Sequence, residues 1–290
     1  MNLVPLGIPT LIIADDPRLV AAARAAYAHW VAEAPVAEPR IELRVEAGTA
    51  SSAEEVSLEV EAEGSRLRLR APGAVGSADA ASRQGAATIA PQLMNDPAGF
   101  ADLLDTLLLF LLTRNGRTPV HASAFMLGDT AVVLAGRSGS GKSTLALAAA
   151  LRGYAILSDD TIFVQLEPSF ALWGFPRPIH VFPGDAPVGE HPTRIRSGKA
   201  KAALPLPKAA SKAEKCALVL LDRDKGLALD PIDPSAAIEA LMDLDPGFDL
   251  LERESREALT ALSAAGAWRL TLSDDPDAAI DLVTRRLAAI

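Results

Sequence analysis

The segment that most constrains the fold is Gly136-Arg-Ser-Gly-Ser-Gly-Lys-Ser143, a complete G-x-x-x-x-G-K-[ST] motif. The apolar run before it, 131–135, predicts a buried strand, and the run after it, 144–150, predicts a helix. The motif requires this strand–loop–helix context. We therefore expect an α/β core in which the loop holds a phosphate chain at the start of the helix.

Each part of the loop has an expected role. Its glycines allow the backbone to wrap a phosphate chain, so that N–H groups and the helix N-terminus face the negative charge. Lys142 is placed to reach the β- and γ-phosphates, and the Ser143 hydroxyl is placed to ligate Mg²⁺. GTPases, ATPases, transporters and small-molecule kinases share this motif, so it leaves the acceptor open. The predicted nucleotide-binding residues are Gly136, Ser138, Gly139, Ser140, Gly141, Lys142, Ser143 and Thr144.

The 290 residues suggest two domains, at roughly 100 to 200 residues each. Near the N-terminus we expect a strand over 6–14 and a helix over 18–34. Apolar and charged residues alternate in 41–46 and 65–70, and more weakly in 56–61, as in half-buried antiparallel strands. With a break at 73–76, the predicted division is a small α+β domain over 1–75, a helical connection over 76–118 and a phosphate-loop domain over 119–290.

From Pro119 onward, short apolar strands alternate with helices, which is typical of an α/β core. Residues 185–215 are rich in Pro, Lys and Ala, and we expect them to be irregular. The predicted strands are 120–127, 130–135, 154–157, 161–165, 217–221 and 268–272, and the predicted helices are 142–151, 236–242, 250–264 and 276–289.

Two adjacent carboxylates, Asp159 and Asp160, follow the strand expected over 154–157. They lie at the carboxyl end of that strand, where ligands bind in α/β sheets. Successive strand residues point to opposite faces, so one carboxylate can act as a base toward an acceptor hydroxyl while the other holds Mg²⁺ or its water. The alternative for such a pair is a solvated turn or a helix cap.

His121 opens the strand that precedes the phosphate-loop strand. A hairpin through Gly128-Asp129 would pair 130–136 with 120–127 and bring His121 level with the loop. There it could orient Asp159 or tune the pKa of that carboxyl. A structural histidine at a strand edge is the alternative interpretation.

The order and spacing of these features resemble one family. His121 lies 15 residues before Gly136, and Asp159-Asp160 begins 17 residues after Lys142. This is similar to the catalytic domain of HPr kinase/phosphorylase and the HPr-kinase-related proteins, whose fold also resembles phosphoenolpyruvate carboxykinase. The resemblance implies a P-loop kinase core that uses ATP and Mg²⁺. It implies that Asp159 is the acid/base for a serine hydroxyl, with His121 as its neighbour, and that Asp160 belongs to the metal and phosphate network.

The chain also departs from the HPr enzyme. It lacks a Glu-Ile-Arg-Gly type signature downstream of the Asp pair, and residues 1–118 do not resemble that enzyme's regulatory domain. It looks more like the related kinases that tailor ribosomal peptides, such as those that phosphorylate a serine of lasso precursor peptides. We therefore predict an ATP/Mg²⁺-dependent kinase acting on a peptide or small-protein partner. The alternatives are a bifunctional HPr serine kinase/phosphorylase and a non-catalytic ATP-binding regulatory protein.

Several basic residues are candidates for substrate or phosphate contacts. Arg177 lies between two prolines, which could rigidify it as a phosphate clamp, or it could sit in a structural turn. Residues 191–215 hold seven Lys or Arg against one acidic residue, which suits ATP phosphates or an acidic peptide as well as a solvated loop. Asp222 ends a buried strand like a Walker B carboxylate, a role that the Asp pair already fills. The candidates in the basic stretch are Arg194, Arg196 and Lys199.

Composition excludes several partners. The net charge of −9 argues against general nucleic-acid or anionic-membrane binding. Cys216 is the single cysteine, so no internal disulfide can form, which fits a reducing compartment. The start of the chain lacks the pattern of a signal peptide, and the apolar run 100–113 is too short to span a membrane and predicts a buried helix. We expect a cytoplasmic protein and leave open whether it forms a homo-oligomer.

Overall fold

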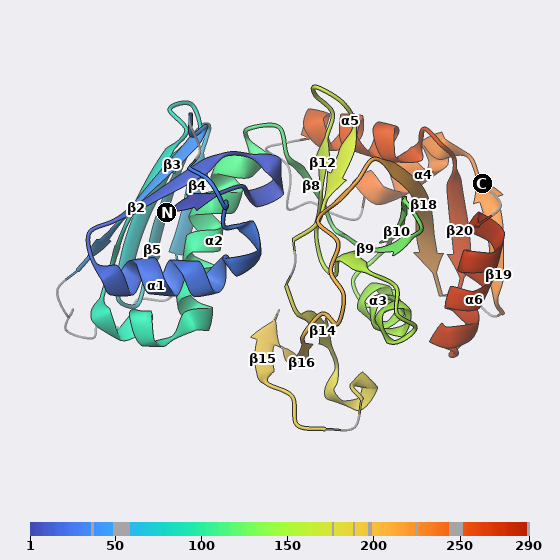
Figure 1. The fold of residues 1–290 in the computed structure, drawn as a ribbon. Helices are drawn as coiled ribbons and strands as arrows, with labels where there is room; N and C mark the ends of the chain where they lie inside the picture. The colour runs from blue at the N-terminus through green and yellow to red at the C-terminus, as the bar shows by residue number, and fades with distance from the viewer. Residues whose placement is uncertain are drawn as a thin grey trace. The chain divides into compact units, whose positions relative to one another are not determined.

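The computed structural model describes residues 1–35, 38–48, 59–175, 177–187, 189–196, 199–223, 226–243 and 252–288. The chain divides into two compact units, Met1–Arg117 and Thr118–Ile290 (Figure 1). The boundary falls one residue before the start that the sequence predicts for the phosphate-loop domain.

The first unit is built on a mixed seven-stranded sheet. Parallel pairing joins β2 to β3 and β3 to β7, and the other neighbours are antiparallel. In order across the sheet, the strands are β1 (Asn2–Leu3), β2 (Thr10–Ala14), β3 (Ile41–Ala47), β7 (Gln84–Ile89), β6 (Ala74–Asp79), β5 (Arg66–Ala71) and β4 (Glu59–Glu63).

Two helices cover one face of this sheet. Helix α1 (Pro17–Ala26) packs on β2 and β3, while α2 (Pro97–Thr113) packs on β5, β6 and β7, and the two helices contact each other. The Asp16 side chain caps α1 by accepting a hydrogen bond from the Arg18 N–H at 2.7 Å. In β3, Leu43 and Val45 are buried while Arg44 between them is exposed, so the alternation in the sequence does place apolar side chains beneath the helices.

Three expectations for this unit are wrong. Strand β6 begins at Ala74, inside the break expected at 73–76, and runs antiparallel to both of its neighbours. Residues 76–117 are therefore no separate helical connection, because they supply most of β6, all of β7 and α2, one of the two helices that cover the sheet. Strand β3 is parallel to both of its neighbours rather than antiparallel. Helix α1 ends at Ala26, well short of residue 34.

The second unit contains a six-stranded sheet whose strands β10, β18 and β20 run parallel. Strand β9 is antiparallel to β10 and β11 is antiparallel to β9, so β11 points the same way as β10. In order across the sheet, the strands are β11 (Ile156–Ser158), β9 (Ala122–Leu127), β10 (Thr130–Ala135), β18 (Lys215–Asp222), β20 (Ala267–Thr271) and β19 (Ala228–Ile232).

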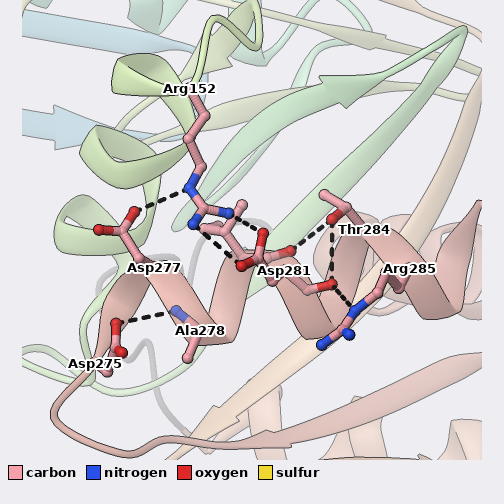
Figure 2. Close-up of polar contacts among 8 residues, drawn as sticks. Arg152, Asp275, Asp277, Ala278, Asp281, Thr284 and Arg285 are labelled. Atoms are coloured by element: carbon pink, nitrogen blue, oxygen red, sulfur yellow. Dashed lines mark hydrogen bonds and ion pairs between the residues drawn. The ribbon is translucent and has the colours of Figure 1, made fainter.

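Helices cover both faces of this sheet. One core cluster joins the sheet to α3 (Lys142–Leu151) and α6 (Pro276–Leu287), and a second joins it to α4 (Pro234–Met242) and α5 (Glu252–Ser263). At the carboxyl end of α3, Arg152 reaches Asp277 at 2.9 Å and also pairs with Asp281, both on α6 (Figure 2). This arrangement of helix, sheet and helix is the α/β core that the sequence predicts.

Two smaller sheets complete the second unit. One contains β8 (Thr118–Val120), β12 (Ile162–Gln165), β13 (Ala171–Trp173) and β17 (Lys212–Ala213). The other contains β14 (Ile179–Val181), β15 (Thr193–Arg196) and β16 (Lys199–Leu204). The expectation that 185–215 is irregular is therefore wrong, because most of the second sheet lies in this stretch. Among the described helices, none combines the length and the apolar character needed to cross a membrane.

Candidate functional site

The topology brings the predicted residues to one edge of the six-stranded sheet. Strands β10 and β11 end at this edge, and antiparallel β9 begins there. Ala122 lies opposite Ala135, so the hairpin register is the predicted one and His121 is level with Gly136. Asp159 and Asp160 directly follow β11. His121, the loop and the carboxylate pair therefore share the edge where α/β sheets bind ligands.

The loop adopts a conformation that requires glycine, as Gly136 and Gly141 show. Gly136 has φ 152°, and a Cβ built there would lie 3.1 Å from the backbone oxygen of Leu221. Gly141, the N-cap of α3, has φ 109°, which side chains rarely tolerate. Lys142 is buried, and its Nζ donates to the carbonyl oxygens of Gly136 at 2.7 Å and Arg137 at 3.2 Å. The lysine thereby holds the loop closed around its own ammonium group.

The surroundings of the buried Ser140 hydroxyl indicate whether this loop suits a phosphate. Ser140 is 8% exposed, and its Oγ has no hydrogen-bond partner among the described residues. A buried hydroxyl without a partner costs free energy on the order of 1–3 kcal/mol, which a phosphate oxygen accepting from it would recover. Together with the helix N-terminus and the Lys142 ammonium, this donor fits an anionic group of the size of a phosphate.

Asp159 is the most buried acidic side chain of the site, at 4% exposed. Ser123 Oγ donates to its Oδ1 at 3.2 Å, and the His180 backbone N–H donates to its Oδ2 at 2.9 Å. Burial raises the pKa of the Asp159 carboxyl, and the charge of Asp160 adds to this effect. The donors on His180 and Ser123, together with the nearby Ser143 hydroxyl of the phosphate loop, oppose it. The carboxyl is therefore poised to exchange a proton nearer neutral pH than an exposed aspartate would be.

Asp160 differs sharply from its neighbour. Its side chain is 76% exposed, and its Oδ1 lies 3.5 Å from His121 Nδ1. His121 thus pairs with Asp160, and not with the Asp159 carboxyl that we expected it to orient. An exposed carboxylate beside the loop can take part in holding Mg²⁺, which usually binds one or two protein carboxylates together with phosphate oxygens. In the described part of the chain, no group of three or more His, Cys, Asp or Glu could hold a metal ion by itself.

A close backbone contact lies beside the turn that carries the Asp pair. A Cβ built on Gly174 would lie 1.9 Å from the carbonyl oxygen of Leu157, so only glycine fits there. Ser158 Oγ donates to the Thr161 carbonyl at 2.6 Å and lies within 3.4 Å of the Phe175 carbonyl oxygen. These contacts hold the turn that presents Asp159 to the loop.

The described contact of Arg177 is with an aromatic ring, and the side chains of the candidates in the basic stretch are not described. The Arg177 guanidinium lies over the Phe175 ring, 4.9 Å from its centroid. Arg194, Arg196 and Lys199 contribute backbone to β15 and β16, but their side chains lie outside the described part of the chain. Their roles remain predictions.

Two further residues beside the loop were not found from the sequence. Ser123 is fully buried in β9, and its contact with Asp159 depends on a strand pairing that no local motif records. Arg223 follows β18, and its Nε donates to the Ser140 carbonyl at 3.4 Å. The only available signal for Arg223 was its place after Asp222, at the end of a predicted buried strand.

Comparisons with known proteins show a similarity to solved structures. No protein-family model matches the chain, and no curated protein matches it. Among solved structures, the chain is similar to the Hpr(Ser) kinase/phosphatase from Coxiella burnetii, with 16% identity and a TM-score of 0.34. The alignment covers 59% of this chain and 97% of that chain. At this level of similarity, the loop and the carboxylates, rather than the likeness, carry the functional conclusion.

Proposed function

We propose that this chain is an ATP/Mg²⁺-dependent kinase that transfers the γ-phosphoryl group to a serine hydroxyl of a peptide or small protein. The observation that carries the proposal is the buried Asp159 carboxyl, which accepts hydrogen bonds from Ser123 and the His180 backbone N–H and has a pKa raised by burial. A nucleotide-binding protein that only senses ATP has no need for a base at this position.

The chain's own groups can be assigned to the steps of transfer. Asp159 accepts the serine proton as the serine oxygen bonds to the γ-phosphorus, while the bond from that phosphorus to the β–γ bridging oxygen breaks and ADP leaves. Lys142 and the loop N–H groups stabilise the negative charge of the transferring group. Ser143 and Asp160 would hold Mg²⁺, which neutralises charge on the β- and γ-phosphates when bound.

The acceptor class rests on the motif spacing rather than on a contact in the structure. The order of His121, the loop and the Asp pair resembles kinases that act on serine, including those that tailor lasso-type precursor peptides. Candidate acceptors are therefore serine-containing precursor peptides, with HPr itself as the competing acceptor.

Mass spectrometry of these acceptors after incubation with the protein, ATP and Mg²⁺ tests the proposal. We expect Asp159→Asn to lower transfer about 10³-fold, because the amide cannot take the serine proton. The affinity for ATP should remain within about twofold of that of the parent protein, because binding of ATP before the reaction does not need the base. Asp230→Asn, an exposed aspartate on β19, is the matched control and should transfer normally.

Each outcome separates the candidate functions. Normal turnover by Asp159→Asn would contradict the assigned base. Phosphate-dependent removal of the phosphoryl group from HPr would favour the bifunctional kinase/phosphorylase. ATP binding with neither transfer to an acceptor nor ATP hydrolysis would favour the regulatory protein.

A further inference from the structure

The sheet of β14, β16 and β15 packs through one face on helix α3, beside the six-stranded sheet (Figure 1). Ile179, Val181 and Leu204 are buried in the same core cluster as the apolar residues of α3. Strand residues alternate between the two faces of a sheet, so the residues between these belong to the opposite face, called here the outer face. Lys201 on β16 is one of them, because its neighbour Ala202 pairs with the buried Val181.

One edge of this sheet lies at the candidate active site. The backbone N–H of His180, in the middle of β14, donates to Asp159 Oδ2 at 2.9 Å. Strand β16 pairs with the other edge of β14. Phe182 follows two residues after His180, a step of about 7 Å in an extended chain. The end of β14 is therefore separated from the carboxyl assigned as the base by the span of a few peptide residues.

The outer face is rich in positive charge. Arg194 pairs with Lys201, and Arg196 pairs with Lys199, in the antiparallel register of β15 and β16. Residues that pair across two strands share a face, so these basic positions all fall on the outer face. The three strands contain no Asp or Glu. This face therefore suits a negatively charged ligand, although the whole chain has a net charge of −9.

Phe182 adds an exposed apolar surface next to this charge. It is 45% exposed, and Lys201 Nζ lies 5.8 Å from the centroid of its ring. No ion pair joins Lys201 to a carboxylate in the described part of the chain. A ring beside an ammonium group matches a glutamate side chain, because the ring contacts the methylene groups and the ammonium group pairs with the carboxylate.

We propose that the outer face binds an acidic segment of the acceptor peptide, an inference that rests on the proposed kinase function. Carboxylates of the segment pair with Lys201 and meet the positive charge of β15 and β16, while methylene groups pack on Phe182. An extended peptide advances about 3.3 Å per residue, so the acidic residues lie about two to four positions from the serine. Charge complementarity of this kind contributes mainly specificity, so the segment selects the acceptor and takes no part in phosphoryl transfer.

Three protein variants and two synthetic peptides test the inference. Both peptides have one serine; one carries glutamates two to four positions away on both sides, and the other carries glutamines there. Dissociation constants are measured without ATP by fluorescence anisotropy, and kcat and KM are measured with Mg²⁺–ATP by mass spectrometry. The variants are Lys201→Ala, Phe182→Ala and the matched control Arg286→Ala, which removes one exposed positive charge from α6.

The expected results differ between the variants. The parent protein should bind the glutamate peptide about tenfold more tightly than the glutamine peptide, and Lys201→Ala should reduce this preference about threefold, the worth of an exposed ion pair. The loss should appear in KM more than in kcat, because the segment binds equally before and during transfer. Phe182→Ala should weaken both peptides by a similar factor, since glutamate and glutamine have the same methylene groups. Arg286→Ala should keep the preference of the parent protein.

Charge reversal sharpens the test. Lys201→Glu should lose more of the preference for glutamate than Lys201→Ala does, and it should gain affinity for a third peptide that carries lysine at the same positions. A misfolded variant would lose affinity for all three peptides, so a gain for the lysine peptide also shows that the sheet still folds.

The outcomes separate this inference from the kinase proposal. If the parent protein binds and phosphorylates the glutamate and glutamine peptides equally, the inference fails and the kinase proposal stands. If the glutamate peptide binds, but neither it nor any other candidate acceptor gains a phosphoryl group, the kinase proposal fails and so does the acceptor assigned to this face. Tighter binding of a single-stranded oligonucleotide than of the glutamate peptide, lost in Lys201→Ala, would assign the outer face to nucleic acid and overturn the inference.

Discussion

Asp159 and Asp222 lie on opposite sides of the phosphate loop and in opposite environments. On the β9–β11 side, Ser123 and Asp159 are 0% and 4% exposed and are bonded to each other. On the β18–β20 side, Asp222 and Arg269 are exposed and make no described side-chain bond. Both sides lie at the same edge of one sheet, so topology alone does not explain the difference.

The contrast indicates that the two sides of the phosphate loop have different functions. A buried carboxyl has a raised pKa and fixed partners, which suits proton transfer at one position. Exposed charged groups are solvated when free and exchange water for ligand at little cost, which suits reversible binding. Changes on the β9–β11 side should therefore alter stability and the rate of chemistry, whereas changes on the β18–β20 side should alter affinity.

The largest effect on the buried side is expected from Gly174→Ala. The added methyl group would lie 1.9 Å from the Leu157 carbonyl oxygen, and a backbone atom cannot rotate away. The free energy of unfolding should fall by about 2–3 kcal/mol, and transfer should fall with it because Leu157 leads into the Asp pair. Denaturant unfolding and turnover of the same preparation measure both.

Gly184→Ala is the matched control for that substitution. Nothing lies within 4 Å of a Cβ built on Gly184, so its stability should change by less than about 0.5 kcal/mol. If Gly174→Ala were as stable and as active as this control, the buried side of the loop would be far more adaptable than its packing indicates.

A smaller effect is expected from Ser123→Ala, which removes one donor from Asp159. A donor to the ionised carboxylate lowers its pKa, so its loss should raise the already elevated pKa of Asp159 further. Because the base must be ionised, the acid limb of the pH–rate profile should move to higher pH. On that limb the rate should fall roughly fivefold, the worth of a hydrogen bond of about 1 kcal/mol.

The high-pH plateau should stay close to that of the parent, because Asp159 remains in place and is fully ionised there. Ser273→Ala, outside the site, serves as the control. An acid limb that does not move in Ser123→Ala would show that Asp159 is not the group that titrates.

The sequence predicts those parts of the site that depend on local features, such as glycines, apolar runs and short turns. The loop, its strand and its helix follow from glycines and apolar runs, and α3 begins at Lys142 as expected. The hairpin register follows from the Gly128-Asp129 turn, because a short turn sets which residues face each other. From these features alone, the sequence predicts that His121, the loop and the Asp pair lie at one edge of the sheet.

The remainder depends on contacts between distant segments. Strand β7 pairs with β3 although about 40 residues separate them, and nothing in either strand indicates the partner or its direction. The donor to Asp159 Oδ2 is the backbone N–H of His180, and a backbone group has no sequence signature. The need for glycine at position 174 arises only because Leu157 lies against it.

The smallest effect is expected from Arg152→Ala, at the far end of α3 from the loop. Arg152 pairs with Asp277 and Asp281 on α6 in solvent (Figure 2). Exposed ion pairs contribute little, so the melting temperature should fall by about 2 °C or less, and less still at high salt, which screens the pair. Turnover, the pH–rate profile and ATP affinity should all match the parent protein. A change in any of them would mean that the C-terminal helix influences both sides of the loop through α3, and the contrast between the two sides would then not be local.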